Sequence, residues 1–99
     1  MPLWNPTLML DGRIIAVPDA YWEEAGVALE VESREYHFYE RGWGRTLKMR
    51  SRMNSHGIFV LQAPPSRIYA EPAGLIEDMV RMYKQGLSRG ALPLQIIPA

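Results

Sequence analysis

The stretch VPDAYWEEAGVALEVES, residues 17–33, constrains the fold most, because it predicts two strands joined by a short turn. Its centre, residues 23–26, is polar and ends in glycine, and the flanking runs are rich in apolar and aromatic residues. If residues 23–26 form a four-residue hairpin loop, Trp22 pairs with Val27. Counting outward then pairs Asp19 with Glu30, so the turn itself sets the register.

Three carboxylates fall on one face of this predicted hairpin. Alternation along the second strand puts Glu30 and Glu32 on one face and Val27, Leu29 and Val31 on the other. Asp19, opposite Glu30, shares the face of the glutamates, where like charges destabilise a sheet. A bound Mg²⁺ or Mn²⁺ ion with Asp19, Glu30 and Glu32 as ligands would offset this repulsion. Alternatively, the face is exposed to solvent and neutralised by nearby arginines.

The charges of the chain are segregated although they sum to zero. Residues 1–40 hold eight acids and two bases, whereas residues 41–70 hold six bases and no acid. Residues 40–56 have the periodicity of a helix, with an apolar arc and an opposite stripe of bases spaced 4, 3 and 4 apart. The stripe consists of Arg41, Arg45, Lys48 and Arg52. It suits contacts to phosphates, or it is simply a solvated helix face.

Two further residues are candidates for chemistry. Arg50 lies in the apolar arc of the predicted helix, and a buried arginine needs a carboxylate or phosphate partner. It would either neutralise the carboxylate face or bind a scissile phosphate. His37 follows the second glutamate along the chain and is either a general base or a half-buried structural histidine.

The remaining sequence predicts a single domain, residues 1–99, of the α/β (α+β) class, with one small mixed sheet flanked by helices. An Asp11-Gly12 turn joins predicted strands 7–10 and 13–22, the second interrupted near Pro18. A short strand is expected at 58–62, a loop at 63–67 and a helix from Pro72 to Gly86, with the tail 87–99 unassigned. With no cysteine, long apolar run or secretory signal, we expect a cytoplasmic protein without a membrane partner or an organic cofactor.

The chain resembles a group of actinobacterial domains in four segments: PLWNPTL, PDAYWEEAGVALEVESREYHF, TLKMRSRMNSHGIFVL and PPSRI. Those domains are related to very-short-patch-repair endonucleases and to the wider PD-(D/E)XK nuclease superfamily. The resemblance covers roughly residues 2–87. It implies a restriction-endonuclease-like fold and Mg²⁺-dependent hydrolysis of DNA. It also implies that Asp19 is the central metal ligand, that Glu30 is the second carboxylate, and that His37 matches a histidine of the group.

The chain departs from these relatives in several places. Glu32 stands where the related sequences carry aspartate and the superfamily carries a lysine that orients water, so His37 or a second metal would do that work. Met49-Arg50 stands where relatives often show Arg-His. The usual first helix, with its own glutamate, is absent before Met1-Pro2. A bare sheet face invites a homodimer. Alternatively, the chain is cut from a longer protein or has lost activity.

The sequence therefore leaves three functions open. The first is an Mg²⁺-dependent DNA endonuclease or its degenerate relative. The second is a non-catalytic domain of the same fold that binds nucleic acid or a protein. The third is an unrelated small α+β interaction domain in which the carboxylate cluster is incidental.

Overall fold

The computed structural model describes residues 1–31 and 40–99, with the backbone alone for residues 40–43, 45 and 46. A mixed sheet of four strands contains the predicted hairpin. Its order is β1 (Leu3–Trp4), β4 (Ala20–Trp22), β5 (Val27–Val31) and β6 (Phe59–Ala63). β5 and β6 are parallel and the other pairs are antiparallel. Trp22 pairs with Val27, which confirms the register counted from the turn.

A second sheet, not predicted from the sequence, is antiparallel throughout. Its order is β3 (Arg13–Ala16), β2 (Thr7–Leu10) and β7 (Gln95–Ile97). Asp11 and Gly12 both have positive φ, 51° and 77°, as a type I′ hairpin turn requires, so this predicted turn is confirmed. The expected strand 13–22 is in fact two strands in different sheets. They separate around buried Pro18, whose nitrogen has no hydrogen to donate to a ladder.

Within the described ranges, three helices connect the strands: α1 (Glu40–Ser55), α2 (Pro65–Ala70) and α3 (Pro72–Arg89). The start of α3 at Pro72 is confirmed. The segment expected as a loop forms α2, because Pro64 is extended and Pro65 suits a first helical turn. α3 does not end at Gly86 but at Arg89, followed by Gly90 with φ 94°. The tail carries β7.

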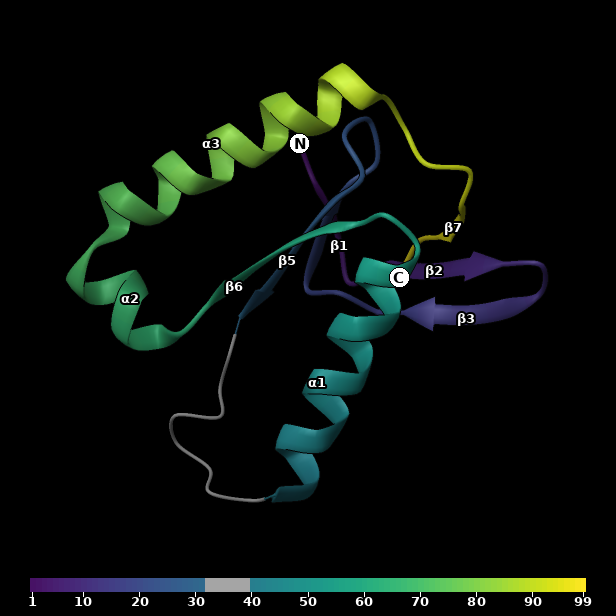
Figure 1. Cartoon of the computed structure of the whole chain (residues 1–99), viewed down its shortest axis with the longest axis horizontal. Helices are drawn as coiled ribbons and strands as arrows, with labels where there is room; N and C mark the ends of the chain where they lie inside the picture. The colour runs from purple at the N-terminus through teal and green to yellow at the C-terminus, as the bar shows by residue number, and fades with distance from the viewer. Residues whose placement is uncertain (32–39) are drawn as a thin grey trace.

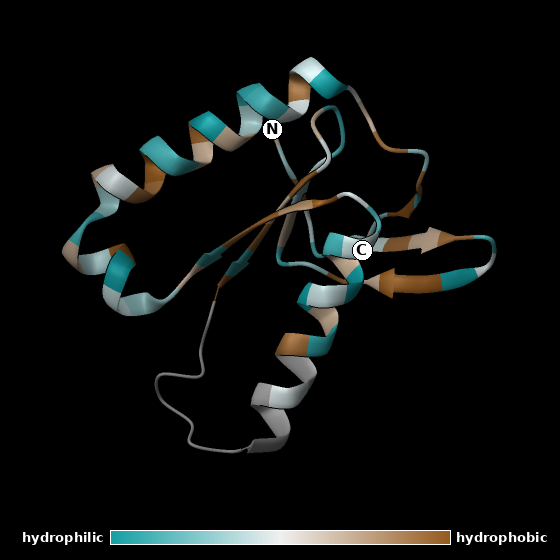
Figure 2. Cartoon of the chain, in the orientation of Figure 1, coloured by the Kyte–Doolittle hydropathy of each residue, from teal (hydrophilic) through white to brown (hydrophobic). Residues whose placement is uncertain are grey.

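The main core lies on the face of the four-stranded sheet that α1 covers. Tyr21, Ala28 and Val60 stand in one row across β4, β5 and β6, so their side chains share a face. They pack with Met53 of α1 and Leu8 of β2. Figure 1 shows α1 and α3 on opposite sides of β5 and β6, and Figure 2 shows hydrophobic residues along these strands. The mixed sheet thus has helices on both sides, and the α/β (α+β) class is confirmed.

α3 is attached to the opposite face through its C-terminal turn. The Arg89 Nη2 atom donates to the carbonyl oxygens of Ala25 (2.9 Å) and Gly26 (3.2 Å), and Nη1 donates to that of Gly57. The guanidinium carbon lies 4.1 Å from the centre of the Phe59 ring. One turn earlier, Gly86 is buried against Ala25, where any Cβ atom would lie 2.1 Å from the Ala25 carbonyl oxygen.

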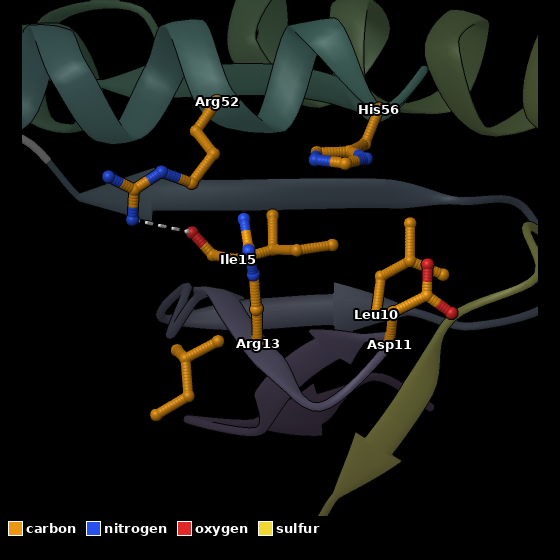
Figure 3. Close-up of a pocket in the computed structure, with 7 residues that line it drawn as sticks. Leu10, Asp11, Arg13, Ile15, Arg52 and His56 are labelled. Carbon is orange, nitrogen blue, oxygen red and sulfur yellow. Dashed lines mark hydrogen bonds between the residues drawn. The ribbon is translucent and has the colours of Figure 1, made fainter.

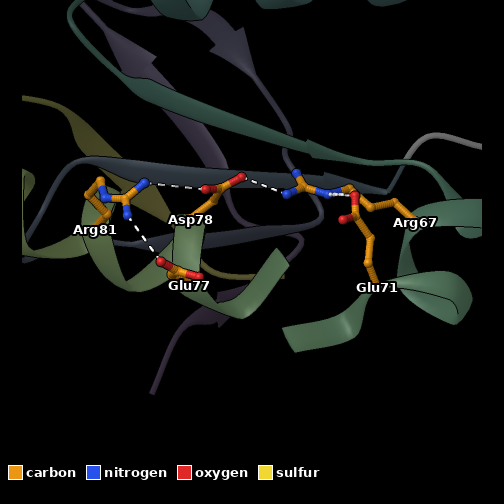
Figure 4. A network of polar contacts seen from close by, with 5 residues as sticks. All are labelled: Arg67, Glu71, Glu77, Asp78 and Arg81. Atoms are coloured by element: carbon orange, nitrogen blue, oxygen red, sulfur yellow. Dashed lines mark hydrogen bonds and ion pairs between the residues drawn. The ribbon is translucent and has the colours of Figure 1, made fainter. Parts of the chain in front are cut away.

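Ion pairs attach α2 to α3 at the other end of the long helix (Figure 4). Arg67 of α2 binds Glu71 at 2.8 Å and Asp78 of α3 at 2.6 Å. Arg81 continues the network to Glu77 and Asp78. The hydrogen bonds that Arg67 donates to Asp78 and Glu71 raise the pKa of Arg67, although burial opposes them. In the described part of the chain, no helix is long and apolar enough to cross a membrane.

We predict that Gly86→Ala destabilises the protein, although alanine is the better helix former. The added methyl would collide with Ala25, and overpacking of this kind costs about 1 to 3 kcal/mol. The control is Gly44→Ala in α1, where a Cβ atom meets nothing within 4 Å and should add up to about 1 kcal/mol. Urea unfolding measures both variants. A higher midpoint for Gly86→Ala would contradict this contact.

A second prediction concerns alkaline unfolding. Burial raises the pKa of Tyr21 to about 12, with Glu23 adding to the shift and Arg89 opposing it. In the unfolded chain the phenol ionises near pH 10. The raised pKa therefore contributes fully to the free energy of unfolding below pH 10, and this contribution is lost as the pH rises towards 12. We expect the wild-type chain to lose about 2 to 3 kcal/mol more than Tyr21→Phe over that interval. Denaturant unfolding of both proteins at each pH tests this. The same dependence of the free energy of unfolding on pH in both proteins would contradict it.

Candidate functional site

A row of polar residues crosses the mixed sheet at the end of the predicted hairpin. Ala20 pairs with Leu29, so Asp19, directly before β4, lies opposite Glu30 of β5. Gln62 of β6 is the parallel partner of Glu30. Glu30 and Gln62 are two residues along their strands from Ala28 and Val60, so their side chains share the face that α1 covers, and Asp19 lies beside them at the start of β4. We call Asp19, Glu30 and Gln62 the carboxylate row.

The two carboxylates each accept a hydrogen bond from the backbone of the other strand. Glu30 Oε1 accepts from the Asp19 N–H at 3.2 Å, and Asp19 Oδ2 accepts from the Val31 N–H at 2.7 Å. These bonds continue the β4–β5 ladder with side chains and partly offset the repulsion between the two charges. A carboxylate has about four lone-pair positions, so Asp19, with one hydrogen bond in the described part of the chain, retains capacity for a further partner.

The third predicted carboxylate, Glu32, and the candidate base His37 lie outside the described residues. Among the described residues, no group of three or more histidine, cysteine, aspartate or glutamate residues could hold a metal ion. The described donors at the row are two carboxylates and the side-chain amide of Gln62. Oxygen donors of these kinds fit Mg²⁺ or Mn²⁺, which keep several water ligands.

Arg50 lies on the side of α1 that packs towards the sheet. It is half-buried, one helical turn before the fully buried Met53. Its Nε atom is buried and has no hydrogen-bond partner in the part of the chain that the structure describes. A buried donor without a partner costs free energy, and an anionic ligand would satisfy it.

The basic stripe of α1 is described only in part. Lys48 and Arg52 are exposed, as expected, while the side chains of Arg41 and Arg45 lie outside the described residues. Arg67, the sixth base of segment 41–70, is paired with Asp78 and Glu71 and so adds nothing to this surface.

Arg52 also lines a pocket of about 680 Å³ between α1 and the β2–β3 hairpin (Figure 3). Its lining residues are Leu10, Asp11, Arg13, Ile14, Ile15, Arg52 and His56. A bulge between β2 and β3 leaves Ile15 without a register partner, and the Ile15 carbonyl oxygen accepts a long hydrogen bond, 3.5 Å, from Arg52. The hairpin and the helix thus meet at a basic pocket.

Sequence reasoning missed three of these residues. Gln62 was expected in a strand, but its place beside Glu30 depends on the parallel register of β5 and β6. His56 follows Arg52 by four positions, a spacing that puts the two on one helix face. That spacing was the available signal, whereas nothing local indicated that Arg13 would face them.

Comparisons with known proteins assign no family. No family model matches the chain, and neither a curated protein nor a solved structure matches it significantly. The nuclease resemblance therefore stays a prediction from the sequence, and the geometry of the site has to carry the functional argument.

We predict that Asp19→Asn preserves stability while Asp19→Ala does not. The asparagine carbonyl oxygen still accepts from the Val31 N–H, whereas alanine leaves this donor to water and loses about 1 kcal/mol. Glu23→Ala, an exposed position in the turn of the same hairpin, is the control and should be neutral. Urea unfolding measures all three. Equal stability of the Asn and Ala variants would show that the hydrogen bond contributes nothing.

Proposed function

We propose that this chain is a metal-dependent endodeoxyribonuclease that hydrolyses phosphodiester bonds of DNA. The observation that carries the proposal is the position of Asp19 opposite Glu30, where each carboxylate accepts a hydrogen bond from the backbone of the other strand. Two half-buried carboxylates, each fixed by a backbone hydrogen bond from the facing strand, suit a divalent cation as ligands. The resemblance to PD-(D/E)XK nucleases assigns the same two residues to the metal.

In this proposal, Asp19 and Glu30 hold Mg²⁺ or Mn²⁺. The bound cation would stabilise charge on the scissile phosphate and activate a water molecule. The reciprocal backbone hydrogen bonds orient both carboxylates, so they need little rearrangement to bind it. Glu32 and His37 remain part of the proposal, as third ligand and as general base.

The basic helix α1 would bind the DNA backbone. Arg50 is the group best suited to the scissile phosphate, since its buried Nε atom lacks a partner among the described residues. Exposed Lys48 and Arg52, with Arg41 and Arg45 of the same stripe, would contact neighbouring phosphates. The absence of cysteine fits a cytoplasmic location, which the proposal includes.

A second candidate function is a non-catalytic DNA-binding domain of the same fold. The observation favouring it is that the hydrogen bonds of Asp19 and Glu30 give both residues a structural role without any metal. The basic surface would then be retained and hydrolysis lost. One pair of assays separates the two candidates.

We predict that the purified protein nicks supercoiled plasmid in Mg²⁺ or Mn²⁺ and that EDTA stops it. Asp19→Asn and Glu30→Gln should each lower the rate about 100-fold or more, because each removes a charged metal ligand while keeping its size. Glu23→Gln, in the turn at the other end of the same hairpin, should cleave at the wild-type rate.

Cleavage that survives in Asp19→Asn would reject the metal site. No cleavage by the wild type, together with salt-sensitive DNA binding, would identify the second candidate function. The absence of both cleavage and binding would reject the two candidates together.

A further inference from the structure

The pocket between α1 and the β2–β3 hairpin is separate from the carboxylate row, with which it shares no lining residue. Its walls come from residues far apart in the chain. Arg13, directly after the Asp11-Gly12 turn, reaches from β3 towards α1, and Arg52 and His56 reach from α1 towards the hairpin (Figure 3). Two guanidinium groups and an imidazole thus converge on one cavity.

The two guanidinium groups have few partners among the residues that the structure describes. Arg13 has no hydrogen bond or ion pair among the described residues, and the described contact of Arg52 is the 3.5 Å bond to the Ile15 carbonyl oxygen. An arginine has five N–H donors in a planar fork that matches a phosphate group. The pocket therefore presents several positively charged N–H donors to a ligand.

The remaining lining adds a second chemistry. Leu10, Ile14 and Ile15 give the pocket an apolar wall. A volume of about 680 Å³ exceeds what one phosphate group needs and lies within the range of sites that take small organic molecules. A group with both an anionic end and an apolar face fits better than an inorganic ion.

We propose that this pocket binds one nucleotide unit of a DNA strand. The phosphate lies between Arg13 and Arg52, and the sugar and base contact the apolar wall and the imidazole of His56. The inference rests on the proposed function, because its ligand is the substrate of the proposed nuclease. It adds the β2–β3 hairpin to the DNA-binding surface, which the basic helix alone does not include.

A substitution of Asp11 tests the proposal through an increase in DNA affinity, whereas substitutions of the arginines test it through a decrease. Its carboxylate lines the same pocket and would repel a phosphate. Asparagine tolerates the positive φ of this position, 51°, and Asn-Gly is a favoured type I′ turn. Asp11→Asn should therefore bind DNA more tightly than the wild type without disturbing the fold.

The experiment measures fluorescence anisotropy of labelled 20-mer DNA, duplex and single-stranded, in EDTA so that no cleavage occurs. Arg13→Gln and Arg52→Gln should each weaken binding about 10-fold and reduce the salt dependence by about one phosphate contact. Asp11→Asn should tighten binding about 3-fold. Arg81→Gln, an exposed arginine paired with Glu77 and Asp78, is the matched control and should change affinity less than about 2-fold.

The proposal would be overturned if the variants of Arg13, Arg52 and Asp11 all bound both forms of DNA with the affinity of Arg81→Gln. A deoxynucleoside monophosphate that binds as tightly as the 20-mer would also overturn it, since the ligand would then be a free nucleotide. Pocket-dependent binding without plasmid cleavage would keep this inference and reject the nuclease. If the wild type cleaves plasmid and the pocket variants bind DNA normally, the nuclease is kept and this inference is rejected.

Discussion

The hydrogen bonds of Arg89 are the interaction on which the rest of the structure depends. One guanidinium group binds carbonyl oxygens from the β4–β5 turn and from the turn between α1 and β6. Carbonyl groups in tight turns need donors, and here a single side chain supplies them while attaching α3 to the sheet. Gly86 allows the close approach. Since the turn fixes the register of β4 and β5, these contacts also maintain the pairing of Asp19 with Glu30 at the far end of the hairpin.

The parts of the fold that could be predicted are those set by local sequence. A four-residue turn determined the pairing of Trp22 with Val27, and strict periodicity indicated α1. β1 and β7 have two and three residues, too few for alternation to be recognised. The second sheet depends on β7 pairing with β2 from the other end of the chain, and no local pattern reports such a contact. Gly86 does not end α3, because this glycine serves the close contact with Ala25 instead. The sequence of the helix alone does not indicate that contact.

The same division holds at the site. Asp19 and Glu30 belong to one hairpin, so counting from the turn brought them together. Gln62 joins them through a parallel pairing across a helical crossover, where a shift of one residue would have changed its face. Arg13 and His56 line one pocket only because a hairpin and a helix pack side by side. What the sequence predicted was the placement of residues within one supersecondary unit; what it missed were residues contributed by neighbouring units.

The β2–β7 pairing has a consequence for folding order. It joins Thr7 to Ile97, so it closes nearly the whole chain into one loop. Contacts of such high sequence separation form late, after the entropy of loop closure has been offset by other packing. The hairpin β2–β3 can form early, but its sheet is complete only when β7 arrives. The pocket stands on this sheet, whereas the carboxylate row stands on the other. The two surfaces would therefore form at different stages of folding. A partly folded chain in which β7 has not yet paired would have the carboxylate row but not the complete pocket.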